Sequence, residues 1–553
     1  MIDNYPFDLG HWSRKISTES SEAQRWFDRG LNWTYGYNHE EAVVCFTKAT
    51  KADANCAMAW WGIAYAGGPF YNRPWIRYSE NEVDQVLPFC RRAVEKAVSL
   101  SEKAIPQEQA LIQALERRYQ NKEERNTAVL ASWQEDFADL MREVQQRFPE
   151  DPDIASLYIE AAVTCTPRQL WDLHSGEIKP TSRMAEVLPV LDHWMAQIER
   201  ENLNHPGLLH MHIHALEMSP VPERSLNAAD RLRGLTPDAG HLEHMSAHVY
   251  VLCGDYAQSV RQSERSVAAD DKYLAYAGDD NFYTTARCHD LHLFMYTAMF
   301  LGQYQKAIYA ADRMKDMARD ELLASSPPFM ASILEGYAAM RIHVLVRFGK
   351  WQELAELPAP TNPQLRPIGT AMRAYGRGVA FAALGQINQA ETARKELLKA
   401  ITKFPQGAIF LSNSLQDMLS IATAMLDGEL NYRKGKYDEA FDCLRTAVRR
   451  DDNLNYTEPW AWMHPPRHAL GALLAEQEHY DEAISVFRSD LGLDQNLPRC
   501  CQHPDNIWAL VGLNDSLRKS GRQEERQLLR QRLELAKARA DTTIETACFC
   551  SQT

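Results

Sequence analysis

The chain has 553 residues, 45% of them hydrophobic and 24% charged, and a formal net charge of −14. These proportions are those of an ordinary globular protein, and the excess of negative charge argues against a protein that tracks the phosphates of nucleic acids. The first residues contain no apolar core of signal-peptide length, and no run of about 18 apolar residues occurs, so we predict neither a signal peptide nor a membrane span. Eleven cysteines without a small-domain framework favour reduced thiols and a cytoplasmic protein.

Small residues and turn aromatics recur along the chain at one spacing. Near the N-terminus Gly30, Ala42 and Ala49 follow it, with His39 in the aromatic position. Small residues let two helices cross closely, and the aromatic side chain fills the wedge between helix pairs, as in tetratricopeptide repeats. Later units that keep this spacing carry Gly254 and Tyr256; Gly302, Tyr304 and Ala307; Gly378, Gly385 and Ala390; Gly435, Tyr437, Ala440 and Ala447; and Gly471, Tyr480 and Ala483.

We therefore predict an all-α fold, a tetratricopeptide-repeat-like α-solenoid in which helix pairs form a right-handed superhelix with a histidine-lined concave groove. Proline and glycine fall between the apolar-periodic stretches, where helices should end, and there is no β-hairpin signal. The predicted organisation is an N-terminal segment over residues 1–20, a single superhelical domain over 21–540 and a C-terminal tail over 541–553. A charged helix over residues 522–540 is predicted to cap the solenoid.

Three histidine-rich motifs follow one another between residues 205 and 296. In the repeat frame, the first helices of three consecutive repeats begin at Pro206, Gly240 and Cys288, and the histidines occupy their second, fifth and ninth positions. Spacings of three and four residues keep side chains on one stripe of a helix, and in stacked repeats this stripe lines the concave groove. The stripe carries His210, His214, His241, His244, His248, His289 and His292, together with Glu217 at a twelfth position.

A cluster of imidazoles on adjacent helices predicts a metal site. Neighbouring first helices pack about 10 Å apart, so rings from two helices can meet between them. Seven rings exceed one tetrahedral shell: either two ions bind, or one binds and the remaining histidines support the ligands or transfer protons. An imidazole-rich site favours copper, iron or zinc over magnesium, calcium or manganese. The alternative is that these are satisfied core or surface histidines.

Two further side chains are candidate catalytic groups. Glu217 shares the histidine stripe, and Tyr296 lies one turn after His292, where its hydroxyl could donate a proton or its ring could stack. A half-exposed concave groove would leave coordination positions open for a substrate, as catalytic metal sites do. The sequence leaves open whether four other residues join the site: His39, Glu160, His464 and His468.

Five stretches of the chain resemble a group of large, mostly uncharacterised tetratricopeptide-repeat proteins found in bacteria and fungi. They read FDRGLNWTYGYNHEEAVVCFTKA, CAMAWWGIA, HPGLLHMHIHALEMSPVPERSL, AGHLEHMSAHVYV and CHDLHLFMY, and the resemblance covers roughly residues 20–535. It implies the repeat fold and places the seven stripe histidines and Glu217 on the group's own histidine motifs. The group usually has proline where this chain has Cys288, and tyrosine where it has His464. The resemblance implies no reaction.

The leading hypothesis is a metal-dependent oxidoreductase that uses a histidine-coordinated copper or iron centre, with one ion or two, to oxidise a small organic molecule in the groove. The first alternative is a zinc-dependent hydrolase or lyase with a metal-bound water. The second is a non-catalytic scaffold that binds a protein or peptide in the groove. The sequence leaves open the metal, the substrate and the oligomeric state, and we expect no nucleic-acid or membrane partner.

Overall fold

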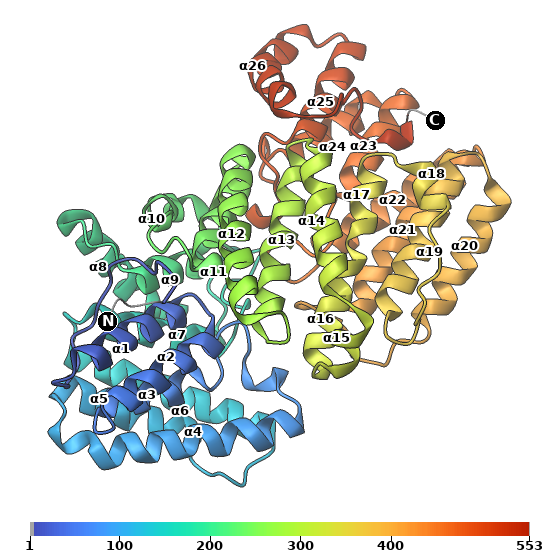
Figure 1. Ribbon diagram of the computed structural model, residues 1–553. Helices are drawn as coiled ribbons and strands as arrows, with labels where there is room; N and C mark the ends of the chain where they lie inside the picture. The colour runs from blue at the N-terminus through green and yellow to red at the C-terminus, as the bar shows by residue number, and fades with distance from the viewer. Residues whose placement is uncertain (1–4, 552–553) are drawn as a thin grey trace.

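The computed structural model describes residues 5–551, and over this range the chain forms 26 α-helices and one two-stranded hairpin, β1 (Ile409–Phe410) paired with β2 (Asn413–Ser414) (Figure 1). Consecutive helices pack as antiparallel pairs, and each pair packs on the next. The chain is therefore an all-α solenoid of the tetratricopeptide type, as the repeat spacing predicts.

The helices of the N-terminal half, up to the middle of the solenoid, are α1 (Ser21–Tyr35), α2 (His39–Ala52), α3 (Ala57–Ala66), α4 (Glu80–Leu100), α5 (Pro106–Glu116), α6 (Thr127–Arg147), α7 (Pro152–Val163), α8 (Met184–Glu201), α9 (Pro206–Leu216), α10 (Leu226–Leu232), α11 (Gly240–Leu252), α12 (Tyr256–Ala277) and α13 (Tyr283–Phe300). Those of the C-terminal half are α14 (Tyr304–Met317), α15 (Asp320–Ser325), α16 (Pro328–Ala339), α17 (Arg341–Arg347), α18 (Trp351–Ala355), α19 (Pro367–Ala383), α20 (Ile387–Ile401), α21 (Leu415–Arg433), α22 (Tyr437–Asp452), α23 (Pro466–Glu476), α24 (Tyr480–Asp490), α25 (Ile507–Lys519) and α26 (Gln523–Arg539).

Glycines on the first helices make room for an aromatic ring on the second helix. The ring of Phe46 on α2 lies between Gly30 of α1 and Gly62 of α3, where an added Cβ would come within 2.6 Å and 2.4 Å of ring atoms. Phe487 on α24 meets Gly471 of α23 in the same way. These contacts explain the spacing seen in the sequence, because only glycine lets the helices approach over the ring. The turn glycines of the repeats have positive φ, between 73° and 79°: Gly254, Gly302, Gly385 and Gly435.

The solenoid curls until segments far apart in the sequence touch on its inner side. Arg77 donates a hydrogen bond to the carbonyl oxygen of Leu411, and Tyr456 donates one to Glu217. Arg168 forms an ion pair with Glu458, with 2.8 Å between Nη2 and Oε2. Connecting loops of both halves therefore cover the inner faces of α9, α11 and α13.

Both terminal segments pack against the solenoid within the described range. Phe7 and Ile16 are buried at the N-terminal end, and Ile544 and Ala547 are buried at the C-terminal end. Cys548 and Cys550 are joined by a disulfide, which corrects, for this pair, the prediction that all the thiols are reduced. The other nine cysteines are free thiols.

One segment, Pro328–Arg347, has the length and mean hydropathy, 1.3, of a membrane-spanning helix, although the sequence shows no uninterrupted apolar run there. It comprises α16 and α17, which contact α13, α14 and α19, and 72% of its most apolar 18-residue window is buried inside the protein. A core helix meets the same criterion of length and composition.

Candidate metal centre

Three neighbouring helices, α9, α11 and α13, carry the histidine motifs. α9 begins at Pro206 and α11 at Gly240, the positions that the repeat frame predicts, whereas α13 begins earlier than Cys288, at Tyr283. Proline suits the first turn of α9 because its missing N–H would have no partner there. α11 contacts both α9 and α13, so the three inner faces form one continuous wall.

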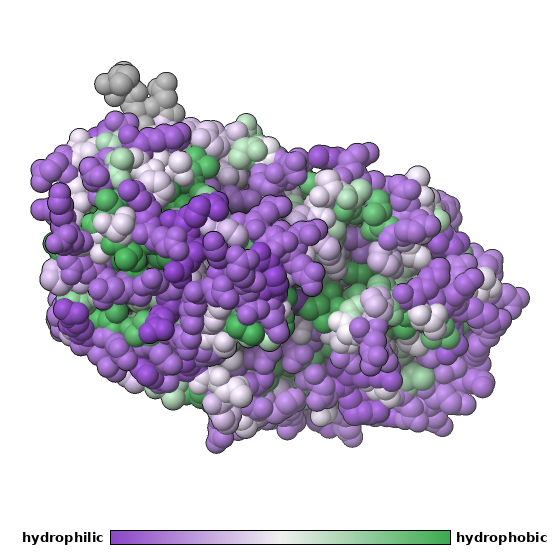
Figure 2. Space-filling model, turned by 90° about the horizontal axis from the view of Figure 1, so that it is seen from below, coloured by the Kyte–Doolittle hydropathy of each residue, from purple (hydrophilic) through white to green (hydrophobic). Residues whose placement is uncertain are grey.

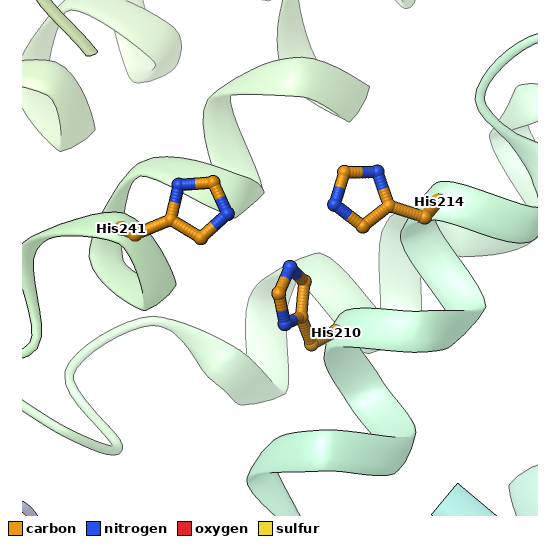
Figure 3. Close-up of side chains that lie close together, drawn as sticks. All are labelled: His210, His214 and His241. Carbon is orange, nitrogen blue, oxygen red and sulfur yellow. The ribbon is translucent and has the colours of Figure 1, made fainter. Parts of the chain in front are cut away.

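Six of the seven predicted histidines come together on this wall as two triads. The first triad consists of His210, His214 and His241, and the second of His244, His248 and His289. In each triad the candidate ligand atoms all lie within 4.8 Å of one another. Figure 3 shows the first triad, with the rings of His210 and His214 from α9 turned toward that of His241 from α11.

The triads lie directly side by side. The ring centroids of His241 and His244 are 5.8 Å apart, and those of His241 and His289 are also 5.8 Å apart. The rings of His214 and His248 are separated by 6.0 Å between centroids. These distances resemble those within each triad, where ring centroids lie between 4.6 and 6.4 Å apart. The six imidazoles therefore form one compact group rather than two distant sites.

The outer ring nitrogens of three histidines donate to oxygen atoms that fix the tautomer. His210 donates from Nδ1 to the carbonyl oxygen of Tyr35, at 2.7 Å. His214 and His248 donate from Nδ1 to the two carboxylate oxygens of Glu217, each at 2.7 Å. A neutral imidazole with its proton on Nδ1 presents a lone pair at Nε2. Glu217 thus ties together one histidine of each triad.

Asp290 lies beside the outer nitrogens of the other three rings. His289 donates from Nδ1 to its Oδ1 at 3.1 Å, and the Nδ1 atoms of His241 and His244 lie 3.7 Å and 3.6 Å from the same oxygen. Ser266 donates a hydrogen bond to Oδ2 and holds the carboxylate in place. Four of the six outer nitrogens therefore donate to an oxygen atom, as is usual for histidines that bind metals. The outer nitrogens of His241 and His244 lie near Asp290 without a hydrogen bond among residues 5–551.

The inner nitrogens, by contrast, have almost no partners. Nε2 of His210, His214, His241 and His289 is buried and makes no hydrogen bond within residues 5–551. Nε2 of His244 and Nε2 of His248 lie 2.7 Å apart. An unpartnered buried polar atom costs about 1–3 kcal/mol, and few remain in folded proteins. Four such atoms at one place are explained if they are ligands.

Burial favours the neutral form of five of the six rings. It lowers the pKa of His210, His214 and His244 well below the ordinary value, and that of His248 to about 3. Burial also opposes protonation of His289, but the hydrogen bond to Asp290 and the nearby carboxylate of Glu458, 3.7 Å from Nε2, raise its pKa above the ordinary value. Neutral imidazoles are the form that coordinates metal ions.

The centre is more enclosed than the predicted half-exposed groove. Tyr71 packs on His214, with ring centroids 4.6 Å apart, and Tyr456 covers Glu217. His289 is the most exposed of the six histidines, at 8%. It lines a cavity of about 360 Å³ that also reaches Tyr37, Arg168 and Glu458. Access to the centre is therefore through this cavity and past His289.

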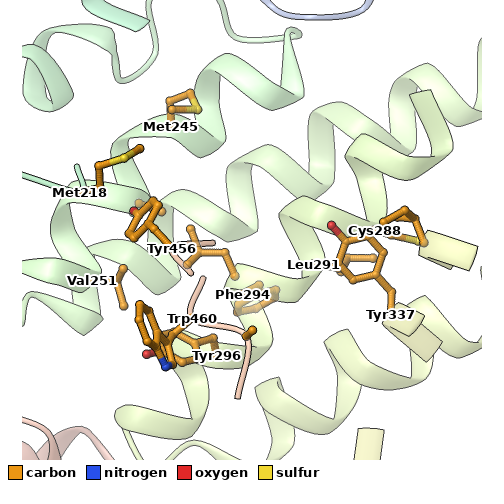
Figure 4. Close-up of a cluster of buried hydrophobic side chains, with 14 of the residues drawn as sticks. Met218, Met245, Val251, Cys288, Leu291, Phe294, Tyr296, Tyr337, Tyr456 and Trp460 are labelled. Carbon is orange, nitrogen blue, oxygen red and sulfur yellow. The ribbon is translucent and has the colours of Figure 1, made fainter. Parts of the chain in front are cut away.

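His292 and Tyr296 lie outside the triads, unlike the single stripe that the sequence predicts. His292 packs against Tyr337 of α16, with ring centroids 5.0 Å apart. Tyr296 meets His503, with 3.0 Å between its hydroxyl oxygen and Nε2, and Figure 4 shows it within a cluster of buried side chains that includes Trp460. α13 has neighbours on two sides: His292 projects about 60° around the helix from His289 and meets α16, and Tyr296 lies about 10 Å along the axis from His289.

The four residues that the sequence leaves open also have partners elsewhere. His39 stacks on Phe70, and Glu160 accepts a hydrogen bond from Tyr65. The Nδ1 atoms of His464 and His343 lie 3.0 Å apart, and His468 contacts Asp490. Asp290 and Glu458 are not among the residues that the sequence predicts for the site. Asp290 comes directly after His289, and Glu458 lies in a distant loop whose surrounding sequence carries no motif.

No protein-family model matches the sequence, and no curated protein matches it. Among solved structures, the Cut9–Hcn1 hetero-tetramer of APC/C is similar over 91% of this chain and 78% of the other, at 13% identity and a TM-score of 0.31. Human IFIT1 dimer with m7Gppp-AAAA aligns over 94% and 91%, at 10% identity and a TM-score of 0.33. Yeast Tom70 aligns over 94% and 96%, at 11% identity and a TM-score of 0.29. These likenesses are too low to assign a family or a function; the chain is a tetratricopeptide-type solenoid by its own helix pairs.

Proposed function

We propose that this solenoid holds a transition-metal ion in each of its two histidine triads and acts on a small molecule in the adjoining cavity. The observation that carries the proposal is the set of four buried, unpartnered Nε2 atoms, those of His210, His214, His241 and His289. Their Nδ1 atoms face a backbone carbonyl or a carboxylate, which leaves the inner lone pairs available for metal ions.

The donor set favours copper, iron or zinc. Imidazole nitrogens suit these metals, whereas magnesium and calcium prefer oxygen ligands. Copper and iron are the favoured choice for an oxidoreductase, and zinc would fit a hydrolase or lyase. Two triads whose rings adjoin within 6 Å between centroids fit a pair of ions, because two-metal sites hold their ions about 3.5–4 Å apart.

A copper or iron pair would supply one-electron redox chemistry, and zinc would supply a Lewis acid. The chain's own residues do the rest. Glu217 fixes the rings of His214 and His248, and Tyr456 donates to the same carboxylate at 3.1 Å. Arg168 neutralises Glu458 at the mouth of the centre and lowers the pKa of that carboxyl well below its ordinary value, against the effect of burial. The enclosing loops exclude water from the inner nitrogens.

A non-catalytic scaffold is the second candidate. On the fold alone it is the better supported of the two, because helical-repeat solenoids commonly bind proteins or peptides. In that case the metal ions, or the packed rings without them, would stabilise the inner wall and a protein partner would bind elsewhere on the solenoid. Turnover of a small molecule that depends on the metal separates the two candidates.

Metal analysis of the purified protein tests the proposal. After expression in metal-replete medium, we expect the wild type to contain up to one metal ion per triad. Elemental mass spectrometry measures this content. Removing one triad with His244→Ala and His248→Ala should remove one ion, while His193→Ala, which changes an exposed histidine, should remove none. Circular dichroism verifies that the variants fold. Only trace metal in a folded wild type would sink the proposal.

The chemistry is then read from the same samples. Copper or iron together with oxygen uptake in the presence of small organic compounds would favour the oxidoreductase. Zinc without oxygen dependence would favour the hydrolase or lyase. Bound metal without any turnover, together with a protein partner whose binding survives the loss of both triads, would favour the scaffold.

A further inference from the structure

The cavity beside the metal centre is built from segments of both halves of the chain. Its volume of about 360 Å³ lies at the lower end of the range for small-molecule sites, about 300–1,000 Å³. Its walls come from the 3-10 helix η1 (Trp75–Arg77), the loop near Arg168, the first turns of α13, one face of α16 and the tip of the β1–β2 hairpin. Figure 2 shows hydrophobic side chains gathered near the middle of one face of the molecule.

Most of the cavity wall is apolar. Aromatic and branched side chains from four segments face it: Phe70, Phe282, Phe329, Ile333, Tyr337 and Ile409. Such a wall contributes about 25 cal/mol for each Å² of apolar ligand surface that it removes from water. The body of a ligand in this cavity is therefore apolar.

Two arginines line the cavity, and only one of them is neutralised. Arg168 pairs with Glu458 and also donates to Asn72 at 2.7 Å. Arg77 donates to the carbonyl oxygen of Leu411 at 3.0 Å and packs over the ring of Phe329, but no carboxylate lies within 4.0 Å of it among residues 5–551. Its side chain is half-buried, and burial together with the charge of Arg168 lowers the pKa of Arg77 to about 10. Arg77 therefore keeps a positive charge at neutral pH without an anionic partner.

We infer that the cavity binds a small organic carboxylate with an apolar body, its carboxylate paired with Arg77 and its other end directed at His289. The inference rests on the proposed function, since it names the class of substrate for that same centre. A guanidinium suits a carboxylate because its planar donors match the two oxygens. This orientation follows from the charges in the cavity. Arg168, at the end near the histidines, is already paired with Glu458, whereas Arg77 has no anionic partner among residues 5–551.

Calorimetric titration with a matched pair of probes tests the inference. 3-Phenylpropionate and the neutral 3-phenylpropanamide share one apolar body and differ only in charge. A charge-assisted hydrogen bond contributes about 1.5–3 kcal/mol, so we expect the wild type to bind the acid at least about tenfold more tightly than the amide. Arg77→Met should abolish this preference, and Arg77→Lys should keep part of it. Arg92→Met, which removes an exposed arginine, should leave it unchanged.

The failures of the two proposals are distinguishable because metal content is measured on the same samples. Arg77 is no ligand, so Arg77→Met should hold as much metal as the wild type. Equal binding of acid and amide, no binding of either, or an undiminished preference in a folded Arg77→Met variant overturns the carboxylate site even if the metal is bound. A preference for the acid in a protein that never binds metal would support the cavity site and overturn only the metal centre.

Discussion

Two groups of buried histidines lie in the same fold and use their ring nitrogens differently. In the second group, which we call the Asp490 network, His503 contacts Asp490 through Nδ1 at 2.9 Å and Tyr296 through Nε2 at 3.0 Å. His468 contacts Asp490 through Nε2 at 2.8 Å and Arg347 through Nδ1. All four nitrogens are partnered. The six histidines of the proposed metal centre, by contrast, leave four inner nitrogens and the outer nitrogens of His241 and His244 without a hydrogen bond among residues 5–551.

The difference lies in where the carboxylates stand relative to the rings. Both groups are buried, and both combine histidines with carboxylates. In the Asp490 network the carboxylate lies between the rings and satisfies them, so the group needs nothing further. In the metal centre Glu217 and Asp290 lie outside the rings and leave the inside open. The direction in which the lone pairs point, rather than burial, therefore distinguishes the proposed metal centre from the Asp490 network.

The largest expected effect is the response of stability to metal. A ligand that binds only the folded state stabilises it by about 4 kcal/mol at 1,000 times its Kd. We expect this gain for the wild type and for His503→Ala, and none for a variant with His210→Ala and His244→Ala, one change in each triad. Thermal unfolding with added metal and with a chelator measures it. An equal gain in the triad variant would show that the ions bind elsewhere.

The next effect is on the Asp490 network. Asp490→Ala removes the partner of His468, His503 and Asn506, and breaking a buried pair costs about 3–5 kcal/mol. We therefore expect a loss of about 3 kcal/mol in the free energy of unfolding, measured in urea, with an unchanged metal content. If Asp490→Ala lost metal without losing stability, the Asp490 network would be the metal site and its assignment as a structural group would be wrong.

The pH dependence of the Asp490 network is expected to be smaller. Burial lowers the pKa of His468 from 6.5 to about 4 in spite of the nearby carboxylate of Asp490. Because the folded value is depressed, the stabilisation is present above pH 6.5 and is lost as the pH falls toward 4. The loss between pH 7 and pH 5 is about 2 kcal/mol. His468→Gln should flatten the profile of unfolding free energy in this window, whereas His479→Gln, an exposed histidine, should not; identical profiles would contradict the assignment.

The smallest effect separates the ligand-holding carboxylate from the ligands. Glu217→Gln keeps the shape of the side chain but weakens its two hydrogen bonds to His214 and His248. Loss of such partners lowers metal affinity 10–100-fold, and because glutamine still accepts one bond we expect about tenfold. Competition with a chromogenic chelator measures the affinity. Complete loss of metal would make Glu217 a ligand itself, and an unchanged affinity would remove it from the centre.

Much of this architecture can be predicted from the sequence because it follows from local spacing. The contacts of Phe46 with Gly30 and Gly62 repeat the spacing of small residues, and the starts of α9 and α11 fall where the repeat frame places them. The spacing of three and four residues also brings six of the predicted histidines together, because neighbouring helices pack at a nearly constant distance from each other.

The rest depends on the curl of the superhelix, which local spacing does not determine. Glu458 reaches the centre from a loop that closes over it only because the two halves meet. The repeat frame predicts His292 and Tyr296 on the same face as the other histidines. α13 has two neighbours, however, so His292 packs against α16 and Tyr296 contacts His503. Asp290 lies off the stripe, but its carboxylate still accepts a hydrogen bond from His289 of α13 and lies within 3.7 Å of His241 and His244 of α11.

Anomalous X-ray diffraction from crystals of metal-replete protein, recorded on both sides of the absorption edge of the metal found by elemental analysis, tests the central claim most directly. We predict two anomalous peaks, one in each triad, with inner Nε2 atoms at about 2.0–2.1 Å from the ions. Crystals without any peak among the six rings, or with hydrogen-bonded waters in place of ions there, would contradict the account.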